Sequence, residues 1–399
     1  MRFAPAAAIT AQPFVVPQVK ETRSASGRWT NASPVTVFER EPSRPQDLHA
    51  STFHPPTLDM LDGYGLGAPP VERSRVTPTW QIRLHETGER AMFDLAVLRE
   101  DTGHPYRLQC EQQVLQELLL ERIETMPNVD LRCGMRVDAV GQDERGIWAE
   151  VRSERIAGSY LIGADGAHSL VREYRGFGFD GETYPETTIL VTTDFPFEQA
   201  IEGLSGVYYV WAPDGTFSLL RLPGLWRCSF YPRPGEPIEE ALGDDSIEHQ
   251  LQSVVPRPER YSVLHRRSYR IHPRVVARYR VGRMLLAGDA AHLNSPSGGM
   301  GMNGGIHDAF NLAEKLSRVL SGADPELLDL YERQRRTVAI EDVIAHANRN
   351  RRRMRETDSM RRRVLLAELQ RAAADPQLAR QHLLQSSMLA GLRRAATIS

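Results

Sequence analysis

The chain has 399 residues, of which 41% are hydrophobic and 25% are charged, and its formal net charge is −2. This composition excludes a wholly disordered chain, a collagen and a simple coiled coil. The near-neutral charge gives no overall attraction to nucleic acid or to an anionic surface. No apolar stretch approaches the roughly 20 residues that cross a bilayer, so we expect no transmembrane segment.

The three cysteines, Cys110, Cys133 and Cys228, lie far apart in the chain. Their odd number and wide spacing predict neither a disulfide framework nor a zinc site. We therefore expect a cytoplasmic location and no metal ion.

The first half of the chain predicts strands and helices after an irregular start. Residues 1–34 are rich in Ala, Ser, Pro and Thr and show no periodicity, which indicates an irregular leader. Regular structure is expected to begin at 35–39, an apolar strand that ends in an acid. A short helix is expected over 56–66, a hairpin over 76–99, a helix over 112–124, and strands within 129–151 and at 160–163.

The second half predicts a β-rich region followed by helices. Residues 183–272 are strand-like, with a hairpin formed by 207–211 and 217–221. A strand over 281–286 leads to a glycine-rich loop at 297–305 and a helix from about Gly305 to Leu320, and the remainder is helical and rich in arginine. Strands alternating with helices around a β-rich insertion predict an α/β fold with a second domain.

The segment Gly288-Asp289 follows a predicted strand and precedes the glycine-rich loop. In open α/β sheets this edge binds ligands, and a carboxylate there can accept hydrogen bonds from sugar or ribityl hydroxyls. Glycines let the backbone approach a flat ring closely. The following helix begins with free N–H groups and a positive dipole end, which favour negative charge on a ligand. The alternative is a purely structural strand–loop–helix turn.

Two other strand ends carry acids. Asp165-Gly166 follows the apolar strand at 160–163 and could order a loop around a pyrophosphate, although Asp-Gly alone is often only a turn. Glu39, followed by Arg40, ends the first strand, where an acid in a dinucleotide fold hydrogen-bonds ribose hydroxyls.

These three segments, in this order and at these distances, resemble the single-component FAD-dependent aromatic hydroxylases, the para-hydroxybenzoate hydroxylase-like flavoprotein monooxygenases. The resemblance spans about residues 35–345. It implies an FAD/NAD(P)-binding, Rossmann-like domain with an inserted β-sheet substrate domain and a helical C-terminus. By the same resemblance, Glu39 would bind the adenosine ribose, Gln112 the ribityl chain, and Asp289 the ribityl and pyrophosphate region. The cofactor-binding residues implied are Glu39, Arg40, Gln112, Asp165, Gly166, Asp289, Pro296, Gly298, Gly301, Met302 and Asn303.

The activity implied by the resemblance is hydroxylation of a small aromatic (phenolic) compound. FAD would be reduced by NADH or NADPH and would react with molecular oxygen to a C4a-hydroperoxide that transfers oxygen to the ring. Candidate residues of the substrate pocket are Tyr209, Trp211 and Arg221, although alternating strand residues also suit an ordinary core. A homodimer is possible, and no nucleic acid partner is expected.

The resemblance also suggests domain boundaries. Residues 35–75, 100–182 and 275–345 would form the FAD-binding domain, and 76–99 with 183–274 the substrate domain. Residues 346–399 would form a helical tail.

One departure concerns the phosphate-binding loop. The family carries Gly-x-Gly-x-x-Gly about 20 residues before the ribose acid, whereas residues 13–20 of this chain contain no glycine. Our hypothesis is that residues from about 14 to 34 are translated out of frame, or arise from a wrong start or a rearrangement. We then expect an incomplete first βαβ unit, an unpaired position beside the strands at 35–39 and 160–163, and weak retention of FAD.

Two alternatives to the monooxygenase remain open: a degenerate, non-catalytic member of the family, and a related flavin reductase or oxidase. The tail adds a further choice, because residues 349–363 contain eight arginines. They could form a patch for nucleic acid or an anionic membrane, or a solvated helix face. The apolar stripe Leu365, Leu366 and Leu369 predicts packing on the body or on a partner subunit.

Overall fold

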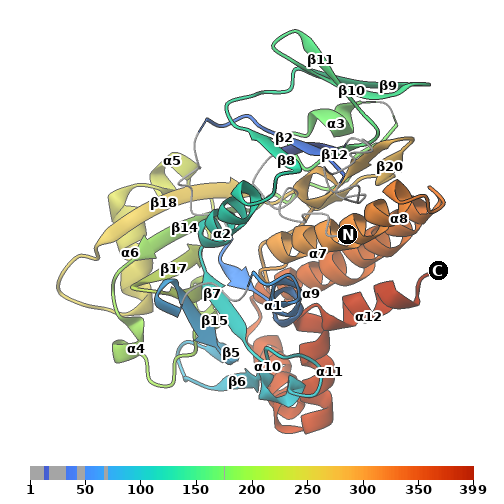
Figure 1. Cartoon of the computed structure of the whole chain (residues 1–399). Coiled ribbons are helices and arrows are strands. Elements are labelled where there is room, and N and C mark those ends of the chain that lie inside the picture. The colour runs from blue at the N-terminus through green and yellow to red at the C-terminus, as the bar shows by residue number, and fades with distance from the viewer. Residues whose placement is uncertain (1–12, 18–32, 43–49, 67–70, 175) are drawn as a thin grey trace.

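The computed structural model describes residues 13–17, 33–42, 50–66, 71–174 and 176–399, and Figure 1 shows their arrangement. A six-stranded sheet carries the segments that end in acids. Its order is β20-β21-β12-β1-β2-β8. Pairs β12–β21 and β2–β8 are parallel. The strands are β1 (Pro13–Pro17), β2 (Val35–Glu39), β8 (Val129–Arg132), β12 (Leu161–Gly163), β20 (Arg280–Val281) and β21 (Met284–Leu286).

The expectation of an unpaired position at the centre of this sheet is wrong. Strand β1 lies between β2 and β12 and pairs with both of them, antiparallel in each case. Pro13 is opposite Glu39 and Pro17 is opposite Val35, so β1 ends at the sheet edge where β2 begins. Residues 1–12 and 18–32, which hold the rest of the predicted leader, lie outside the described residues.

Helices cover this sheet and join it to the rest of the molecule. Leu312 and Leu316 of α7 (Gly301–Leu320) pack with Val37 and Leu285 of the sheet. Phe310, also on α7, packs with the apolar face of α2 (Gln112–Glu124). The predicted helix at 112–124 is therefore present with the predicted bounds. The same part of the molecule contains three further helices, α1 (Pro55–Gly63), α3 (Leu170–Glu173) and α8 (Leu327–Val338). It also contains a three-stranded sheet of β3 (Thr52–Phe53), β7 (Arg107–Cys110) and β4 (Ser74–Thr77).

Two smaller sheets complete this side of the molecule. One is a hairpin-like extension formed by β9 (Ala139–Asp143), β10 (Gly146–Val151) and β11 (Glu154–Gly158). The other contains β13 (Asp180–Gly181), β19 (Arg274–Val275) and β22 (His292–Leu293).

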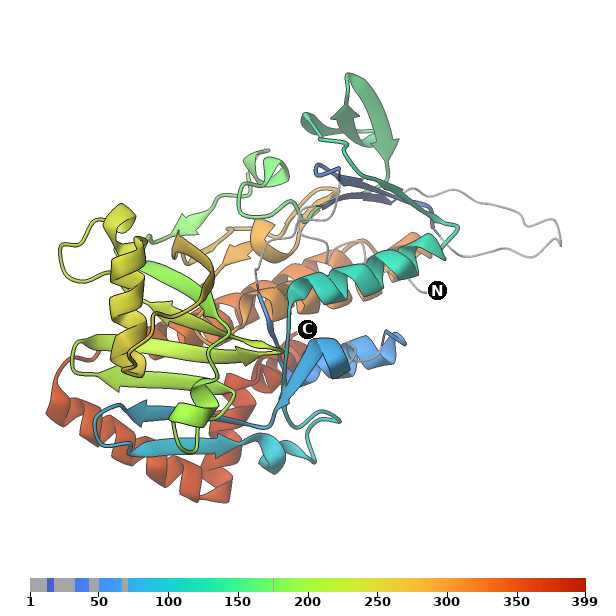
Figure 2. The ribbon, with the colours of Figure 1, turned by 90° about the vertical axis from the view of Figure 1, so that its left-hand side faces the viewer.

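A seven-stranded sheet forms the second part of the molecule (Figure 2). Strand β5 pairs in parallel with β15, which places residues 79–94 in the same sheet as 187–270. One face packs on α6 (Asp244–Val254) through residues that include Val191, Phe217 and Leu251. The strands are β5 (Thr79–Leu84), β6 (Arg90–Asp94), β14 (Thr187–Thr193), β15 (Val207–Ala212), β16 (Gly215–Leu222), β17 (Leu225–Phe230) and β18 (Val263–Arg270); α4 (Phe197–Ala200) and α5 (Ile238–Ala241) connect them.

The C-terminal helices pack on the body, at the end of the sheet that holds β5 and β6 (Figure 1). Leu366 and Leu369 are buried with Phe93, as the apolar stripe predicts. Arg351 and Arg355 pair with Glu186. The helices are α9 (Ala345–Met354), α10 (Ser359–Ala374), α11 (Pro376–Ser386) and α12 (Leu389–Thr397). Within the described residues, no helix is long and apolar enough to span a membrane.

Several element boundaries differ from the sequence-based expectation, and two of these differences bear on the site. Residues 280–286 form the short antiparallel pair β20–β21, because Gly282 turns the chain with a φ of 63°. Helix α7 begins at Gly301 and not near Gly305, which brings Met302 and Asn303 into its first turn.

Candidate functional site

The two strand-to-Asp turns lie side by side. Their strands β12 and β21 are parallel neighbours, with Gly163 opposite Leu286. The backbone N–H of Ala287 also donates to the Gly163 carbonyl oxygen at 3.0 Å. A single cavity of about 740 Å³ is lined by Gly166 after the first strand and by Asp289 after the second. The turns therefore share one cleft.

The Asp165 carboxylate is turned toward its own segment. It is buried, and its Oδ1 accepts a 2.5 Å hydrogen bond from the Ser169 hydroxyl. Burial raises the pKa of Asp165, while the hydrogen bonds to Ser169 and to nearby backbone act against this rise. Arg172 follows and donates to the carbonyl oxygens of Ala167 and Ala290, which ties the first turn to the second. Asp165 thus shapes the cavity wall without lining the cavity.

A fully buried carboxylate, Asp308 on α7, holds the second turn. Its Oδ2 accepts from the backbone N–H of Gly288 at 3.0 Å and lies 2.7 Å from His292 Nε2, and its Oδ1 accepts from Arg335 Nε at 2.6 Å. Burial opposes ionisation of Asp308, but His292 and Arg335 outweigh it and lower the pKa to about 2. The resulting anion fixes the backbone immediately before Asp289.

The loop before α7 approaches its neighbours closely. Gly298 and Gly299 have φ values of 101° and 67°, which side chains rarely adopt. A Cβ on Gly299 would lie 2.9 Å from Thr52 Cβ. Both glycines line the cavity together with Thr52, Pro296 and Gly301. The glycines therefore leave backbone, with no side chain, facing this part of the cavity.

Asn303 holds this loop in place through hydrogen bonds. Its amide nitrogen donates to the carbonyl oxygens of Thr52 at 2.8 Å and Gly299 at 2.7 Å. Its Oδ1 accepts from the backbone N–H of His54 and from the Thr57 hydroxyl. Asn303 is fully buried and does not line the cavity, so it acts on the loop and not directly on a ligand.

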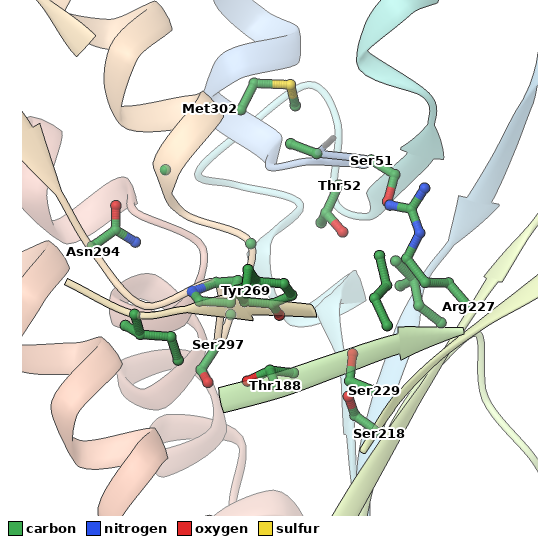
Figure 3. A pocket seen from close by; sticks show the side chains of 18 of the residues that line it. Ser51, Thr52, Thr188, Ser218, Arg227, Ser229, Tyr269, Asn294, Ser297 and Met302 are labelled. Atoms are coloured by element: carbon green, nitrogen blue, oxygen red, sulfur yellow. The ribbon is translucent and has the colours of Figure 1, made fainter. Parts of the chain in front are cut away.

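The opposite wall of the cavity is a polar face of the seven-stranded sheet. Arg267, Leu190, Ser229, Ser218 and Tyr209 are successive cross-strand partners on β18, β14, β17, β16 and β15, so they share one face. The residues between them point to the apolar core under α6. Figure 3 shows hydroxyl and phenol groups on this side of the pocket and the loop residues opposite. Its lining side chains from the sheet include Thr188, Leu190, Tyr209, Ser218, Arg227, Ser229, Tyr231, Arg267 and Tyr269.

Arg227 connects the polar face to the rest of the cavity. Its guanidinium donates to Ser51 Oγ at 2.8 Å and to Glu111 Oε1 at 2.7 Å (Figure 3 shows Arg227 beside Ser51). The side chain is buried, so this ion pair fixes the sheet against the segment that precedes α2.

The structure brings together most of the residues that the sequence singled out for the cofactor. Those that line the cavity are Gln112, Gly166, Asp289, Pro296, Gly298, Gly301 and Met302. Glu39, Arg40, Asp165 and Asn303 are not among the lining residues. Glu39 accepts a 2.9 Å hydrogen bond from the backbone N–H of Glu41, and partial burial raises its pKa.

Of the three pocket candidates, only Tyr209 lines the cavity. Trp211 is 1% exposed and donates from its indole nitrogen to the Arg353 carbonyl oxygen at 3.0 Å, so it belongs to the core. Arg221 pairs with Glu198 and lies outside the lining.

Sequence reasoning missed the polar face of the sheet. Thr188, Ser218, Ser229 and Tyr269 are on strands, and Tyr231 directly follows the end of β17. The available signal was the alternation of apolar and polar residues in 226–230, which places Arg227 and Ser229 on one face; the segment 187–193 shows no such alternation.

The flavin end of FAD fits this cavity. A volume of about 740 Å³ lies within the range of roughly 300–1,000 Å³ that is usual for cofactor and ligand sites. The backbone of Gly298 and Gly299 can approach a flat ring, and α7 begins at Gly301 without a side-chain cap, so its N–H groups can serve a ligand.

The comparisons with known proteins cover most of the chain. The family model described as an FAD binding domain matches residues 33–347. The chain is 34% identical over 374 residues to para-nitrophenol 4-monooxygenase of Pseudomonas sp. (strain WBC-3), covering 90% of this chain and 91% of that protein. It is 33% identical over 323 residues to 6-hydroxy-3-succinoylpyridine 3-monooxygenase HspB of Pseudomonas putida (strain DSM 28022 / S16), covering 79% and 81%. The crystal structure of p-nitrophenol 4-monooxygenase PnpA from Pseudomonas putida DLL-E4 is similar with a TM-score of 0.81 and 30% identity, covering 90% of this chain and 91% of that one.

Proposed function

Since the chain belongs to the family of FAD-dependent aromatic monooxygenases, we propose that it hydroxylates a small phenolic compound, with NADH or NADPH as the electron donor. The observation that carries this proposal is the single cavity that joins the glycine loop to the polar face of the seven-stranded sheet. One side of that cavity suits a flat cofactor ring, and the other side suits a small ring with polar substituents.

The residues that would hold FAD come from both strand-to-Asp turns and from the start of α7. Asp289 would accept hydrogen bonds from hydroxyl groups of the cofactor, and the backbone at Gly298 and Met302 would face its ring. When bound, FAD supplies the redox chemistry that activates molecular oxygen. The N–H groups and the dipole of α7 would stabilise negative charge on the bound ring.

Residues on the sheet would bind and orient the phenol. Desolvation raises the pKa of Tyr269 to about 12, so its phenol stays protonated at neutral pH and can donate a hydrogen bond. Ser218 and Ser229 add hydroxyls that can donate or accept. With Leu190 and Leu220 they form a mixed wall that binds an aromatic ring and limits the water beside it.

Within the described residues, the first strand does not lead toward the position expected for a phosphate loop. In a complete dinucleotide fold the first strand leads directly into the phosphate loop. Here β1 runs in the opposite direction, and Pro17 lies beside the start of β2, away from the edge at Glu39. We therefore expect FAD to dissociate during gel filtration and activity to depend on added FAD. A purified chain that keeps one FAD per protein would contradict this expectation.

The proposal also includes the division of the chain and its location. We assign 76–99 and 183–274 to the substrate domain, in keeping with β5 and β6 sharing a sheet with β14–β18. A cytoplasmic location is proposed as well. The similar proteins are named as monooxygenases, which does not support the alternative that this chain is a degenerate, non-catalytic member of the family.

The test measures NADH and NADPH consumption with excess FAD over a panel of phenols, with products identified by mass spectrometry. We expect at least one phenol to stimulate consumption and to yield a product that contains added oxygen. If every phenol is recovered unchanged while hydrogen peroxide accumulates, the reductase or oxidase alternative holds instead.

A pair of variants tests the role of the sheet. Tyr269→Phe removes a phenol that lines the cavity, and we expect KM for the phenol to rise severalfold. The matched control is Tyr174→Phe, because Tyr174 packs against the apolar core between the six-stranded sheet and α7 and does not line the cavity. Equal kinetics in both variants would contradict the assignment.

A further inference from the structure

A small side chamber of about 30 Å³ adjoins the main cavity below the glycine loop. The two spaces share Arg107, Tyr209, Ser297, Gly298 and Met354 in their walls. On its other side, the chamber is closed by the C-terminal helices α9 and α11. A group held by the chamber would therefore lie next to whatever occupies the main cavity.

The wall of the chamber carries basic groups. Arg107, Arg353, His346 and His382 all line it, and no carboxylate is among its lining residues in the part of the chain that the structure describes. Arg107 is 3% exposed. Its guanidinium donates to the Ser386 carbonyl oxygen at 3.3 Å, is hydrogen-bonded with Tyr209 and lies over the Trp80 ring at 5.8 Å. These partners are neutral, and its buried Nε has no hydrogen-bond partner. Nδ1 of His346 is likewise buried without a partner.

The positive charge in this wall rests on the arginines. Burial, followed by the nearby arginines, lowers the pKa of His346 to about 3 and that of His382 to about 4, so both rings are neutral at pH 7. Burial also lowers the pKa of Arg107, but a guanidinium keeps its proton in proteins. A buried cation without an opposite charge is unfavourable, and an anion beside it removes this penalty.

We propose that the chamber binds a compact anionic group beside Arg107. Its volume holds about two water molecules, which matches a carboxylate or a small inorganic anion. The source is either an acidic substituent of the aromatic substrate or a free monovalent anion. The first source rests on the proposed function, because the ring of that substrate would lie beside Tyr209 in the main cavity.

Thermal unfolding of the full chain with excess FAD tests the chamber without turnover. Sodium chloride and sodium nitrate are titrated against sodium gluconate at equal ionic strength, since gluconate is too large for the chamber. We expect a saturable rise in Tm with chloride or nitrate only. Arg107→Gln should raise the half-saturating concentration at least tenfold, whereas Arg107→Lys should retain binding. The matched control is Arg352→Gln, because Arg352 is exposed on the same helix as Arg353 and does not line the chamber.

Two ligands of similar size separate the sources. Binding of 4-hydroxybenzoate and of the uncharged 4-methylphenol is measured by calorimetry with and without chloride. If chloride and Arg107→Gln each weaken the binding of 4-hydroxybenzoate but not of 4-methylphenol, the substrate supplies the anion. If the binding of 4-hydroxybenzoate is unaffected while chloride or nitrate binds, the chamber holds a free anion. Identical titrations with gluconate, or an Arg107→Gln protein that responds like the wild type, would overturn the proposal. If Arg107→Gln shows no cooperative unfolding, Arg353→Gln takes its place under the same criteria. Because none of these measurements requires hydroxylation, they remain decisive even if the proposed activity is absent.

Discussion

Replacing Asp308 with Asn should remove the charge that holds the turn before Asp289. The carboxylate is fully buried and is contacted by Arg335 at 2.6 Å, His292 at 2.7 Å and the Gly288 N–H at 3.0 Å. Its pKa of about 2, against an ordinary 3.8, alone corresponds to about 2 kcal/mol of stability at neutral pH. The variant also leaves Arg335 buried without an opposite charge, and breaking such a pair typically costs about 3–5 kcal/mol. We expect a loss in this range, together with weaker FAD binding.

The assay is urea unfolding with excess FAD, compared with Asp329→Asn. Asp329 pairs with Arg280 at the surface, where such a pair contributes about 1 kcal/mol or less. The double variant Asp308→Asn/Arg335→Met should recover part of the lost stability, because no unpaired charge remains. A loss from Asp308→Asn no larger than that from Asp329→Asn would refute the reasoning.

Three further predictions concern the glycine loop, a buried histidine and the thiols. Gly299→Ala should weaken FAD binding at least tenfold in a fluorescence titration, whereas Gly235→Ala, also at positive φ but with open space around it, should not; equal affinities would exclude a close approach at the loop. Burial lowers the pKa of His307 to about 3, so its neutral form stabilises the folded protein above about pH 6.5, and this contribution is lost as pH falls below that value. His307→Gln should therefore flatten the dependence of unfolding free energy on pH between 6.5 and 3 by up to about 1.4 kcal/mol per pH unit, and an unchanged slope would contradict the burial of a neutral ring. A thiol reagent should label Cys133 rapidly in the folded protein and all three cysteines only in denaturant, since the other two are buried; fast labelling of more than one would disagree with the fold.

The apolar periodicity of the sequence predicts those single strands and helices whose buried face is set by residues close together in the chain. The strand at 35–39 and the helix at 112–124 have the predicted bounds because their apolar spacing matches the faces they bury. The start of α7 was placed too late because Gly301, Gly304 and Gly305 are typical of loops. In the fold, a Cβ on Gly305 would lie 3.2 Å from the Cα of Gly288, so the helix uses glycine to pack against that turn.

Features that depend on long-range pairing could not be predicted in the same way. The direction of β1 is set by its pairing with β2 and β12, which are distant from each other in sequence. The polar wall of the cavity is likewise assembled from several strands, and Ser229 meets Ser218 and Leu190 only through cross-strand register. Trp211 was a reasonable pocket candidate by alternation, but the C-terminal helices cover that end of the sheet and bury it.

The most direct test of the central claim is an isotope measurement during turnover. The chain is supplied with FAD, NADH or NADPH, a phenol that stimulates consumption, and ¹⁸O₂. The account predicts a product that carries one ¹⁸O atom from molecular oxygen in its ring hydroxyl. Products without the label, or labelled hydrogen peroxide with the phenol intact, would contradict it.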